Sequence, residues 1–144
     1  NFEMITDYWK DTGTPNDIIH ANGEVLKNMK SYNFSDVDQT TTLTGNVMIG
    51  KNSKIFGNSQ IIGPCIIGEN CQIGPNVIIG PNCSINNDSQ ISNCSIQNSI
   101  IMKNCIIDSK IKIHNSIIAS NSKISIVNND TEKIFLLGEG TQIM

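Results

Sequence analysis

The sequence predicts an all-β fold, a parallel coil of short strands with three flat sides, preceded by one α-helix. Three observations carry this prediction. From Leu43 to Ile91 every sixth residue is aliphatic, which is a strict internal repeat. The residue two places before each of these aliphatics is small or slim, as at Ser53 and Cys65. Upstream of the repeat, residues 15–29 place apolar side chains at the spacing of a helix.

The helix comes first along the chain. Thr14 can cap its start, Pro15 suits the first helical position, and Asp17 favours the positive end of the helix dipole. We therefore expect a helix over about residues 15–30, followed by a linker over residues 31–36. One face of this helix carries Ile18, Asn22, Val25 and Met29, with Ile19 and Leu26 beside it.

The repeat begins near Val37, and its period of six matches neither a helical turn nor the two-residue alternation of a single strand. It fits a short strand followed by a corner. Glycine and asparagine supply the corners, because they tolerate positive φ at low cost. Three hexads make one coil of about 18 residues, roughly 4.8 Å tall by the spacing of paired strands. Residues 37–127 therefore predict about five coils.

The aliphatic column points inward, and its register slips after Ile91 but continues. Its members are Leu43, Ile49, Ile55, Ile61, Ile67, Ile73, Ile79, Ile85, Ile91, Ile96, Ile101, Ile107, Ile113, Ile118 and Ile124. Residues 128–133 are polar and predict a loop. The apolar residues 135–137 and a last hexad ending at Ile143 predict a closing strand or cap, which a coiled fold needs at its open end.

Composition excludes several classes of function. The net charge is −3 and there is no arginine, which argues against a surface that grips nucleic-acid phosphates. No apolar run approaches the roughly 20 residues that span a bilayer, so we expect no membrane partner. The five cysteines include no C-x-x-C pair, so we expect small core side chains in a reducing, cytoplasmic compartment. The first residue is Asn1 rather than methionine, which suggests an excised piece.

One wall of the predicted coil is apolar outside as well as inside. Residues about 18 apart stack on one wall, and the outward residues of this wall are Met48, Ile66, Ser84, Ile100 and Ile117, flanked by Met102 and Ala119. Such a stripe marks an interface more often than an accident. We therefore predict that Met48, Ile66, Ile100, Met102 and Ile117 contact further copies of the chain in a closed symmetric oligomer. The alternative is an exposed apolar patch without a partner.

The hexads over residues 37–127 resemble the hexapeptide-repeat family of left-handed parallel β-helices, whose best-known members are trimeric acyltransferases. The left hand is implied by this resemblance. A second resemblance lies upstream. Residues 9–15 read Trp-Lys-Asp-Thr-Gly-Thr-Pro, and a predicted helix containing Ala21-Asn22 follows. This is similar to the closing segment of the sugar-1-phosphate nucleotidyltransferase catalytic domain.

The two resemblances together imply a long glucose-1-phosphate thymidylyltransferase or one of its guanylyl- or uridylyl-transferring relatives. Residues 1–35 would then be the remnant of the catalytic domain, and residues 36–144 a left-handed β-helix domain with a C-terminal cap. The resemblance implies that Asp11 helps to bind catalytic Mg²⁺ in the full-length parent. The glycine-rich nucleotide loop of the family is absent, so we expect the chain itself to be non-catalytic and to serve oligomerisation and regulation.

Two alternatives stay open. The first is a hexapeptide-repeat acetyltransferase that uses acetyl-CoA on an amino or nucleotide sugar, with His114 as the general base. No tyrosine follows His114, and the family's H-x-x-Y-x-G stretch is missing. The second alternative is a purely structural module. The sequence names neither the nucleotide base nor the sugar.

Overall fold

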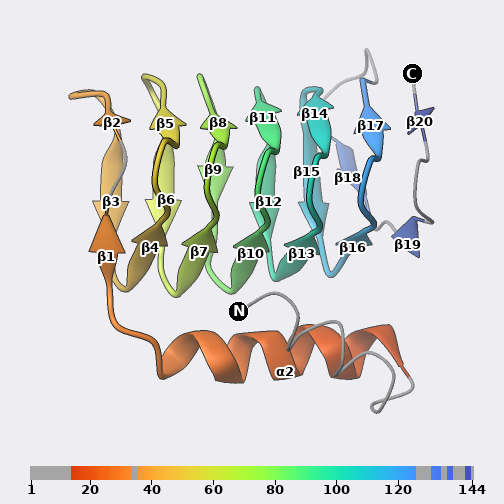
Figure 1. Ribbon diagram of the computed structural model, residues 1–144. Coiled ribbons are helices and arrows are strands. Elements are labelled where there is room, and N and C mark those ends of the chain that lie inside the picture. The colour runs from red at the N-terminus through yellow and green to blue at the C-terminus, as the bar shows by residue number, and fades with distance from the viewer. Residues whose placement is uncertain (1–13, 34–35, 126–130, 134–135, 138–141, 144) are drawn as a thin grey trace.

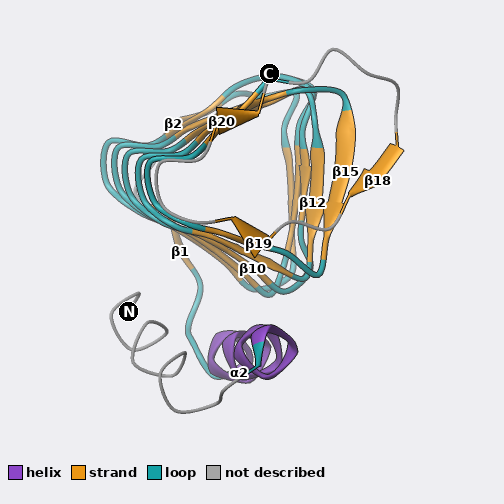
Figure 2. Ribbon diagram, turned by 90° about the vertical axis from the view of Figure 1, so that its right-hand side faces the viewer, coloured by secondary structure: helices purple, strands orange, loops and turns teal. Residues whose placement is uncertain are grey.

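The computed structural model describes residues 14–33, 36–125, 131–133, 136–137 and 142–143. Its short strands run parallel and form three sheets that enclose a triangular interior, with helix α2 alongside one of them (Figure 2). The molecule is a left-handed parallel β-helix with a single helix in its described part. The repeat predicted the parallel coil, and the family resemblance implied its left hand. Helix α2 lies across the strands of sheet A (Figure 1).

Each wall of the β-helix is one sheet. Sheet A consists of β1 (Tyr32–Asn33), β4 (Val47–Ile49), β7 (Cys65–Ile67), β10 (Cys83–Ile85), β13 (Ser99–Ile101), β16 (Ile117–Ile118) and β19 (Leu136–Leu137). Sheet B consists of β2 (Asp36–Val37), β5 (Lys54–Ile55), β8 (Gln72–Ile73), β11 (Gln90–Ser92), β14 (Ile106–Asp108), β17 (Lys123–Ile124) and β20 (Gln142–Ile143). Sheet C consists of β3 (Thr42–Thr44), β6 (Gln60–Ile62), β9 (Ile78–Ile79), β12 (Ser95–Gln97), β15 (Ile111–His114) and β18 (Thr131–Lys133).

The strands from β2 to β16 make five complete turns, which agrees with the predicted number of coils. The fold continues beyond them. The polar segment 128–133 was predicted to be a loop, but residues 131–133 form β18 and pair with β15. Strands β19 and β20 likewise pair with β16 and β17, in the same register as earlier coils. Residues 126–130 lie outside the described part.

The predicted inward column forms the core. Its isoleucines from Ile49 to Ile124 are buried and belong to one continuous apolar cluster, so the register slip after Ile91 does not interrupt the core. Leu43 is the exception, with 39% of its surface exposed. It lies in β3, the terminal strand of sheet C, where no preceding strand packs against it. The column therefore begins at an open end of the β-helix.

The small inward residues satisfy main-chain oxygens of the next coil. Ser53 Oγ donates to the main-chain oxygen of Gly68 at 2.6 Å, and Cys71 Sγ, one coil further, lies 3.2 Å from that of Asn86. The main-chain N–H of Cys71 donates in return to Ser53 Oγ at 3.0 Å. Burying an unpaired peptide oxygen costs roughly 1–3 kcal/mol. Serine and cysteine therefore serve here as small side chains that also carry a donor.

Asparagine holds most of the tight corners. Eleven residues other than glycine have positive φ in the described part, and all are asparagine except Asp88. Several of these side chains bond to their counterparts in the next coil, as Asn104 Nδ2 does to Asn121 Oδ1 at 2.8 Å. Asparagine adopts left-handed backbone more readily than most residues with a Cβ. The corners are therefore specified by local backbone preference and by ladders of side-chain amides.

We expect two substitutions at Asn104 to separate these contributions. Asn104 has φ of 58°. Alanine pays about 1–2 kcal/mol for left-handed backbone, whereas glycine avoids that cost. The free energy of unfolding from urea titration should therefore fall more for Asn104→Ala than for Asn104→Gly. Equal losses would show that the amide ladder, and not the backbone conformation, selects asparagine at this corner.

Helix α2 spans Pro15–Lys27, close to the predicted range. Its start follows the predicted signals: Pro15 occupies the first turn, and Thr14 is the N-cap, with its Oγ1 accepting from the main-chain N–H of Asp17 at 3.2 Å. The ion pair between Lys27 and Glu24 is largely exposed, so it contributes little to stability. What holds the helix in place is its apolar face, which lies against sheet A.

Candidate functional site

The apolar outer stripe of sheet A lies beneath α2, and the prediction that it contacts further copies of the chain is wrong. Met48, Ile100 and Ile117 are at most 1% exposed within the single chain, and Ile66 is 8% exposed. Ile18 and Ile19 pack with Ile100, Ile117 and the half-buried Met102, while Leu26 packs with Met48 and Ile66. The stripe therefore has a partner already, which is the chain's own helix.

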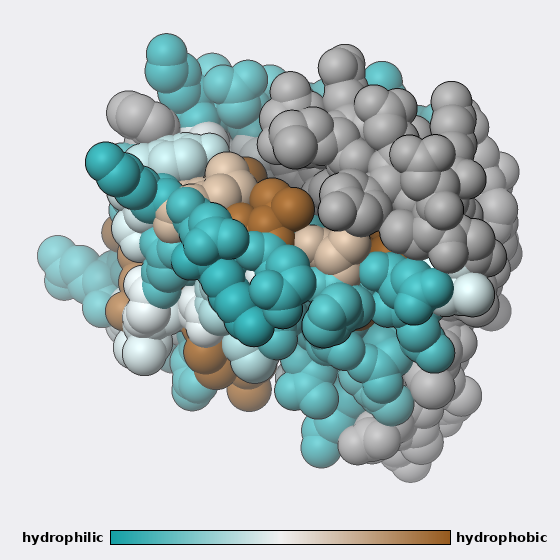
Figure 3. All heavy atoms as spheres, turned by 90° about the horizontal axis from the view of Figure 1, so that it is seen from below, coloured by the Kyte–Doolittle hydropathy of each residue, from teal (hydrophilic) through white to brown (hydrophobic). Residues whose placement is uncertain are grey.

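The dimensions of the helix and the stripe match. Thirteen residues make α2 about 20 Å long at 1.5 Å per residue. The five strands from β4 to β16 span about 19 Å at the usual strand spacing. One helical turn, about 5.4 Å, is close to one coil, so residues four apart on the helix meet successive coils. Figure 3 shows this face from the helix side, with hydrophilic residues over most of its described surface.

A polar contact lies in the middle of this apolar junction. Ser84, the one polar residue of the stripe, donates from Oγ to Asn22 Oδ1 at 2.6 Å. Asn22 is 1% exposed, and no partner for its Nδ2 lies in the described part of the chain. A buried polar pair costs free energy when it is broken, so it favours one axial position of the helix over a shifted one.

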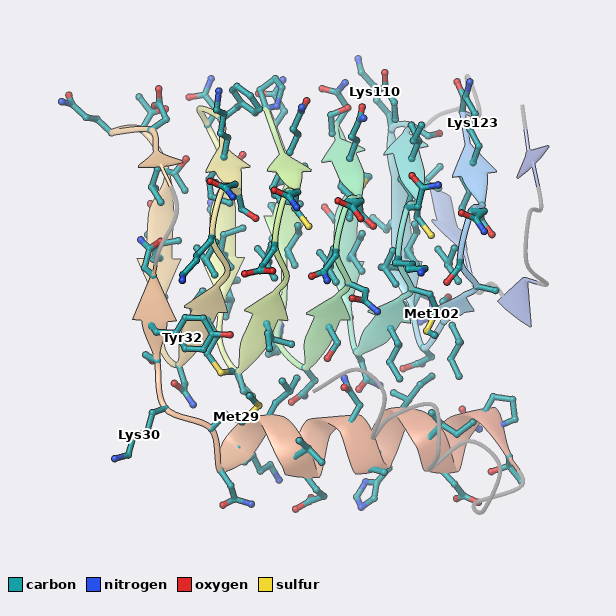
Figure 4. The ribbon with its side chains drawn as sticks, in the orientation of Figure 1. Met29, Lys30, Tyr32, Met102, Lys110 and Lys123 are labelled. Carbon is teal, nitrogen blue, oxygen red and sulfur yellow. The ribbon has the colours of Figure 1, made fainter. Side chains whose placement is uncertain are left out.

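The C-terminal end of α2 is held by the corner that leads into β4. The Asn46 side-chain amide donates to the main-chain oxygen of Met29 and, at 3.5 Å, to that of Leu26. These oxygens belong to the end of a helix, where carbonyl groups lack partners within the helix. Figure 4 shows Met29 at this end of α2 and Met102 beside its other half. The junction is thus fixed at its end, its middle and along its apolar face.

The two halves of this junction are the apolar face of the helix and the outer stripe of sheet A. The sequence shows both, but the partner predicted for the stripe was another copy of the chain. The signal was present, since the apolar face of the helix and the outer stripe have the same length and a short linker joins them. The roles of Asn46 and Ser84 had no such signal. Both sit in repeat positions that look like any other corner or outward position.

The second feature is a hollow of about 320 Å³ on the outer face of sheet C. Its lining includes Gly80, and it is bordered by Ile78, Gln97, Lys112 and His114. Ile78 is exposed and His114 is half-buried. His114 therefore lies at the edge of a cavity, at the end of β15.

The surroundings of His114 do not prepare it as a general base. Asn98 Nδ2 donates to Asn115 Oδ1, which leaves the Asn115 amide nitrogen 3.3 Å from His114 Nδ1. In the tautomer in which Nδ1 accepts this bond, Nε2 carries the proton of the neutral ring. Nε2 is then a donor and has no lone pair with which to take a proton from a substrate. Among the residues whose side chains are described, no carboxylate lines the hollow.

The predicted metal site cannot be built from the described residues. Asp11 lies outside them, and no group of three or more His, Cys, Asp or Glu side chains in the described ranges could hold a metal ion. We therefore derive no chemical step through Mg²⁺. Within the described ranges, no helix has the length and the apolar character that a membrane span requires.

All five cysteines are free thiols in the interior, as predicted. Burial raises the pKa of Cys83 and of Cys94 to about 12 and that of Cys105 to about 11, from an ordinary 9.0. The thiolate forms are therefore suppressed at neutral pH. A reactive thiol needs the opposite environment, one that is exposed and lowers its pKa.

The raised thiol pKa values predict alkaline sensitivity. Between pH 9 and pH 12 the unfolded thiols lose protons that the folded thiols keep, so the free energy of unfolding should fall as pH rises from about 9. Urea titrations at pH 7 and pH 10, with a reducing agent, measure this fall. Cys83→Ser should make the fall smaller, because serine does not ionise in this range. A fall of unchanged size in Cys83→Ser would assign it to other groups.

Comparisons with known proteins assign this architecture to a fold class and to a family. A three-sided coil of hexads defines the hexapeptide-repeat class of left-handed β-helix domains. The chain belongs to the GMPPB C-terminal domain family, whose sequence model matches residues 56–144, more than half of the chain. The family match lies within the β-helix and begins after the helix and the first coil.

Two individual proteins are similar in part. Glucose-1-phosphate thymidylyltransferase from Streptomyces antibioticus is 33% identical over 52 residues, which are 36% of this chain and only 15% of that protein. A mutant perosamine N-acetyltransferase from Caulobacter crescentus, solved with CoA and GDP-perosamine, has a TM-score of 0.61 at 16% identity. That match covers 75% of this chain and 52% of the other, and it shows the shared fold alone.

Proposed function

We propose that this chain is the C-terminal oligomerisation and regulatory region of a sugar-1-phosphate nucleotidyltransferase. Such an enzyme joins a nucleoside triphosphate to a sugar 1-phosphate and releases pyrophosphate. The observation that supports the proposal is the packing of α2 against the outer face of sheet A. The helix follows directly on the Trp-Lys-Asp-Thr-Gly-Thr-Pro segment, and it is packed rigidly against the β-helix. A catalytic domain joined to that segment would have its position fixed relative to the coil.

The finer parts of the proposal rest on the sequence and on the partial similarity to a thymidylyltransferase. We propose glucose 1-phosphate and thymidine triphosphate as substrates, with Mg²⁺ bound in part by Asp11 in the full-length parent. Bound there, Mg²⁺ would supply positive charge for the reacting phosphates. We further propose a homotrimer in the cytoplasm, where five buried thiols stay reduced.

Pyrophosphate release from the parent enzyme and from this chain alone tests the proposal. With glucose 1-phosphate and Mg²⁺, the parent should turn over dTTP faster than GTP or UTP, and the chain alone should be inactive. Asp11→Asn in the parent should lower turnover, while Asp17→Asn, an exposed carboxylate on α2, should not. A parent that forms no nucleotide sugar with any of the three triphosphates would refute the proposal and leave a purely structural role.

Acetyl transfer is a second candidate, because His114 and Lys112 border a hollow on a fold that also occurs in an N-acetyltransferase. The contact of His114 Nδ1 with the Asn115 amide, rather than with a carboxylate, argues against it. We expect no release of free CoA from acetyl-CoA with amino sugars or nucleotide-linked amino sugars as acceptors. CoA release that His114→Ala abolishes, in a variant that melts like the parent chain, would instead establish this activity.

A further inference from the structure

Sheet C has an exposed apolar side chain, Ile78, near the centre of its outer face. Sheet A is covered by α2. The outward side chains of sheet B are mostly polar: Lys54, Gln72 and Gln90 follow one another, and the half-buried Ile106 lies between Gln90 and Lys123. On sheet C the outward residue of β9 is Ile78, which is 43% exposed. No other large hydrophobic side chain in the described part is more exposed. Ile62 lies half-buried on the neighbouring strand β6.

The hollow at Gly80 lies beside this side chain. Its lining combines Ile78 with the uncharged polar Ser95 and Gln97, and Lys112 is the residue paired with Ser95 one coil further on. Lys112 is in turn paired in register with Glu132 of β18. The centre of sheet C is therefore an apolar projection next to a depression, and the charged positions lie toward one end. Interface centres are depleted in charged residues in this way.

We propose that a second copy of this chain docks on sheet C, with Ile78 at the centre of the contact. The inference rests on the proposed role of the region in assembly and names the surface that performs it. The surface around Ile78 carries little charge, so it does not complement a strongly charged partner. A second copy presents the same weakly charged wall, with a projection and a hollow of its own, so in a closed trimer the projection of each copy can face the hollow of the next.

The size of the wall is sufficient for such a contact. Six strands about 4.8 Å apart and hexads about 20 Å wide give roughly 500 Å² for each copy. The total of roughly 1,000 Å² is near the lower limit for a specific protein–protein interface. We therefore expect a contact that one charged substitution can break. Lys110 and Lys123 lie at the edge of the β-helix away from α2 (Figure 4).

The mass in solution, measured by light scattering over a range of chain concentrations, tests the inference. The unsubstituted chain should have a multiple of 15.8 kDa, whereas Ile78→Glu should dissociate at least tenfold more readily. Gln72→Glu is the matched control, because it places the same charge at an outward position of sheet B and should leave the mass unchanged. Ile78 is exposed, so Ile78→Glu should melt like the unsubstituted chain.

Crosslinking gives a second measurement that does not depend on weakening the contact. Because all five native thiols are buried, an introduced cysteine is the thiol that a bis-maleimide reaches. Gln97→Cys at the hollow should form crosslinked dimers, and Gln72→Cys should not. An assembly that Ile78→Glu leaves intact, or that crosslinks equally at both positions, would overturn the choice of sheet C alone. A monomeric unsubstituted chain would remove the assembly role itself.

Discussion

Gly80→Ala should destabilise the β-helix by about 3 kcal/mol or more. Gly80 has φ of 101°, and a Cβ at this position would lie 1.8 Å from the main-chain oxygen of Ile62. Positive φ alone costs a residue with a Cβ roughly 1–3 kcal/mol. The clash adds to this cost, because the atom in the way is backbone and cannot rotate aside. At about 3 °C per kcal/mol, the melting midpoint should fall by roughly 10 °C.

Gly23→Ala is the matched control for this experiment. A Cβ at Gly23 would lie 3.5 Å from Asn82 Oδ1, an ordinary contact, and the position is inside α2. Alanine is favoured over glycine in a helix by about 1 kcal/mol, so Gly23→Ala should be neutral or stabilising. Both variants lose the same freedom in the unfolded chain, so their difference reports the folded state. Equal melting midpoints for the two would show that β9 and β6 can separate at no cost.

Ile100→Glu should detach α2 from sheet A. Ile100 is fully buried against Ile18 and Ile19, and no basic side chain belongs to that cluster. Losing a buried aliphatic side chain costs about 2–5 kcal/mol, and an unpaired carboxylate in the same place costs more. Undocking of the helix lets the carboxylate reach water, so it sets the upper limit of the loss. We expect a lower helical signal in circular dichroism and faster proteolysis within residues 14–30.

Gln90→Glu is the control, since it adds the same charge to an exposed outward position of sheet B and should change neither signal. The experiment also separates two roles for the stripe. If Ile100→Glu lowered only the mass of the assembly and left α2 protected, then the stripe would contact another copy of the chain. Because Ile100 is buried within one chain, we expect α2 to detach before the mass of the assembly falls.

Much of the fold could be read from the hexads, because a six-residue period leaves few ways to pair strands and face aliphatics inward. Ile91 and Ile96 illustrate this, since both are buried although the register slips between them. The roles of individual glycines were less readable. Gly50 does not have positive φ, yet a Cβ there would lie 2.7 Å from the backbone of Gly68. Sequence patterns do not distinguish a glycine needed for backbone conformation from one needed for space.

The sequence by itself determined the helix, the walls and the direction of every inward aliphatic side chain, because these follow from local periodicity and corner residues. It also showed that Met48, Ile66 and Ile100 face outward. Only the tertiary structure decided what covers them. Burial of an apolar stripe depends on which surface approaches it, and no local pattern records that the chain would turn at residues 28–31 to lay its own helix there. The same step moved the expected partner surface to Ile78 on sheet C.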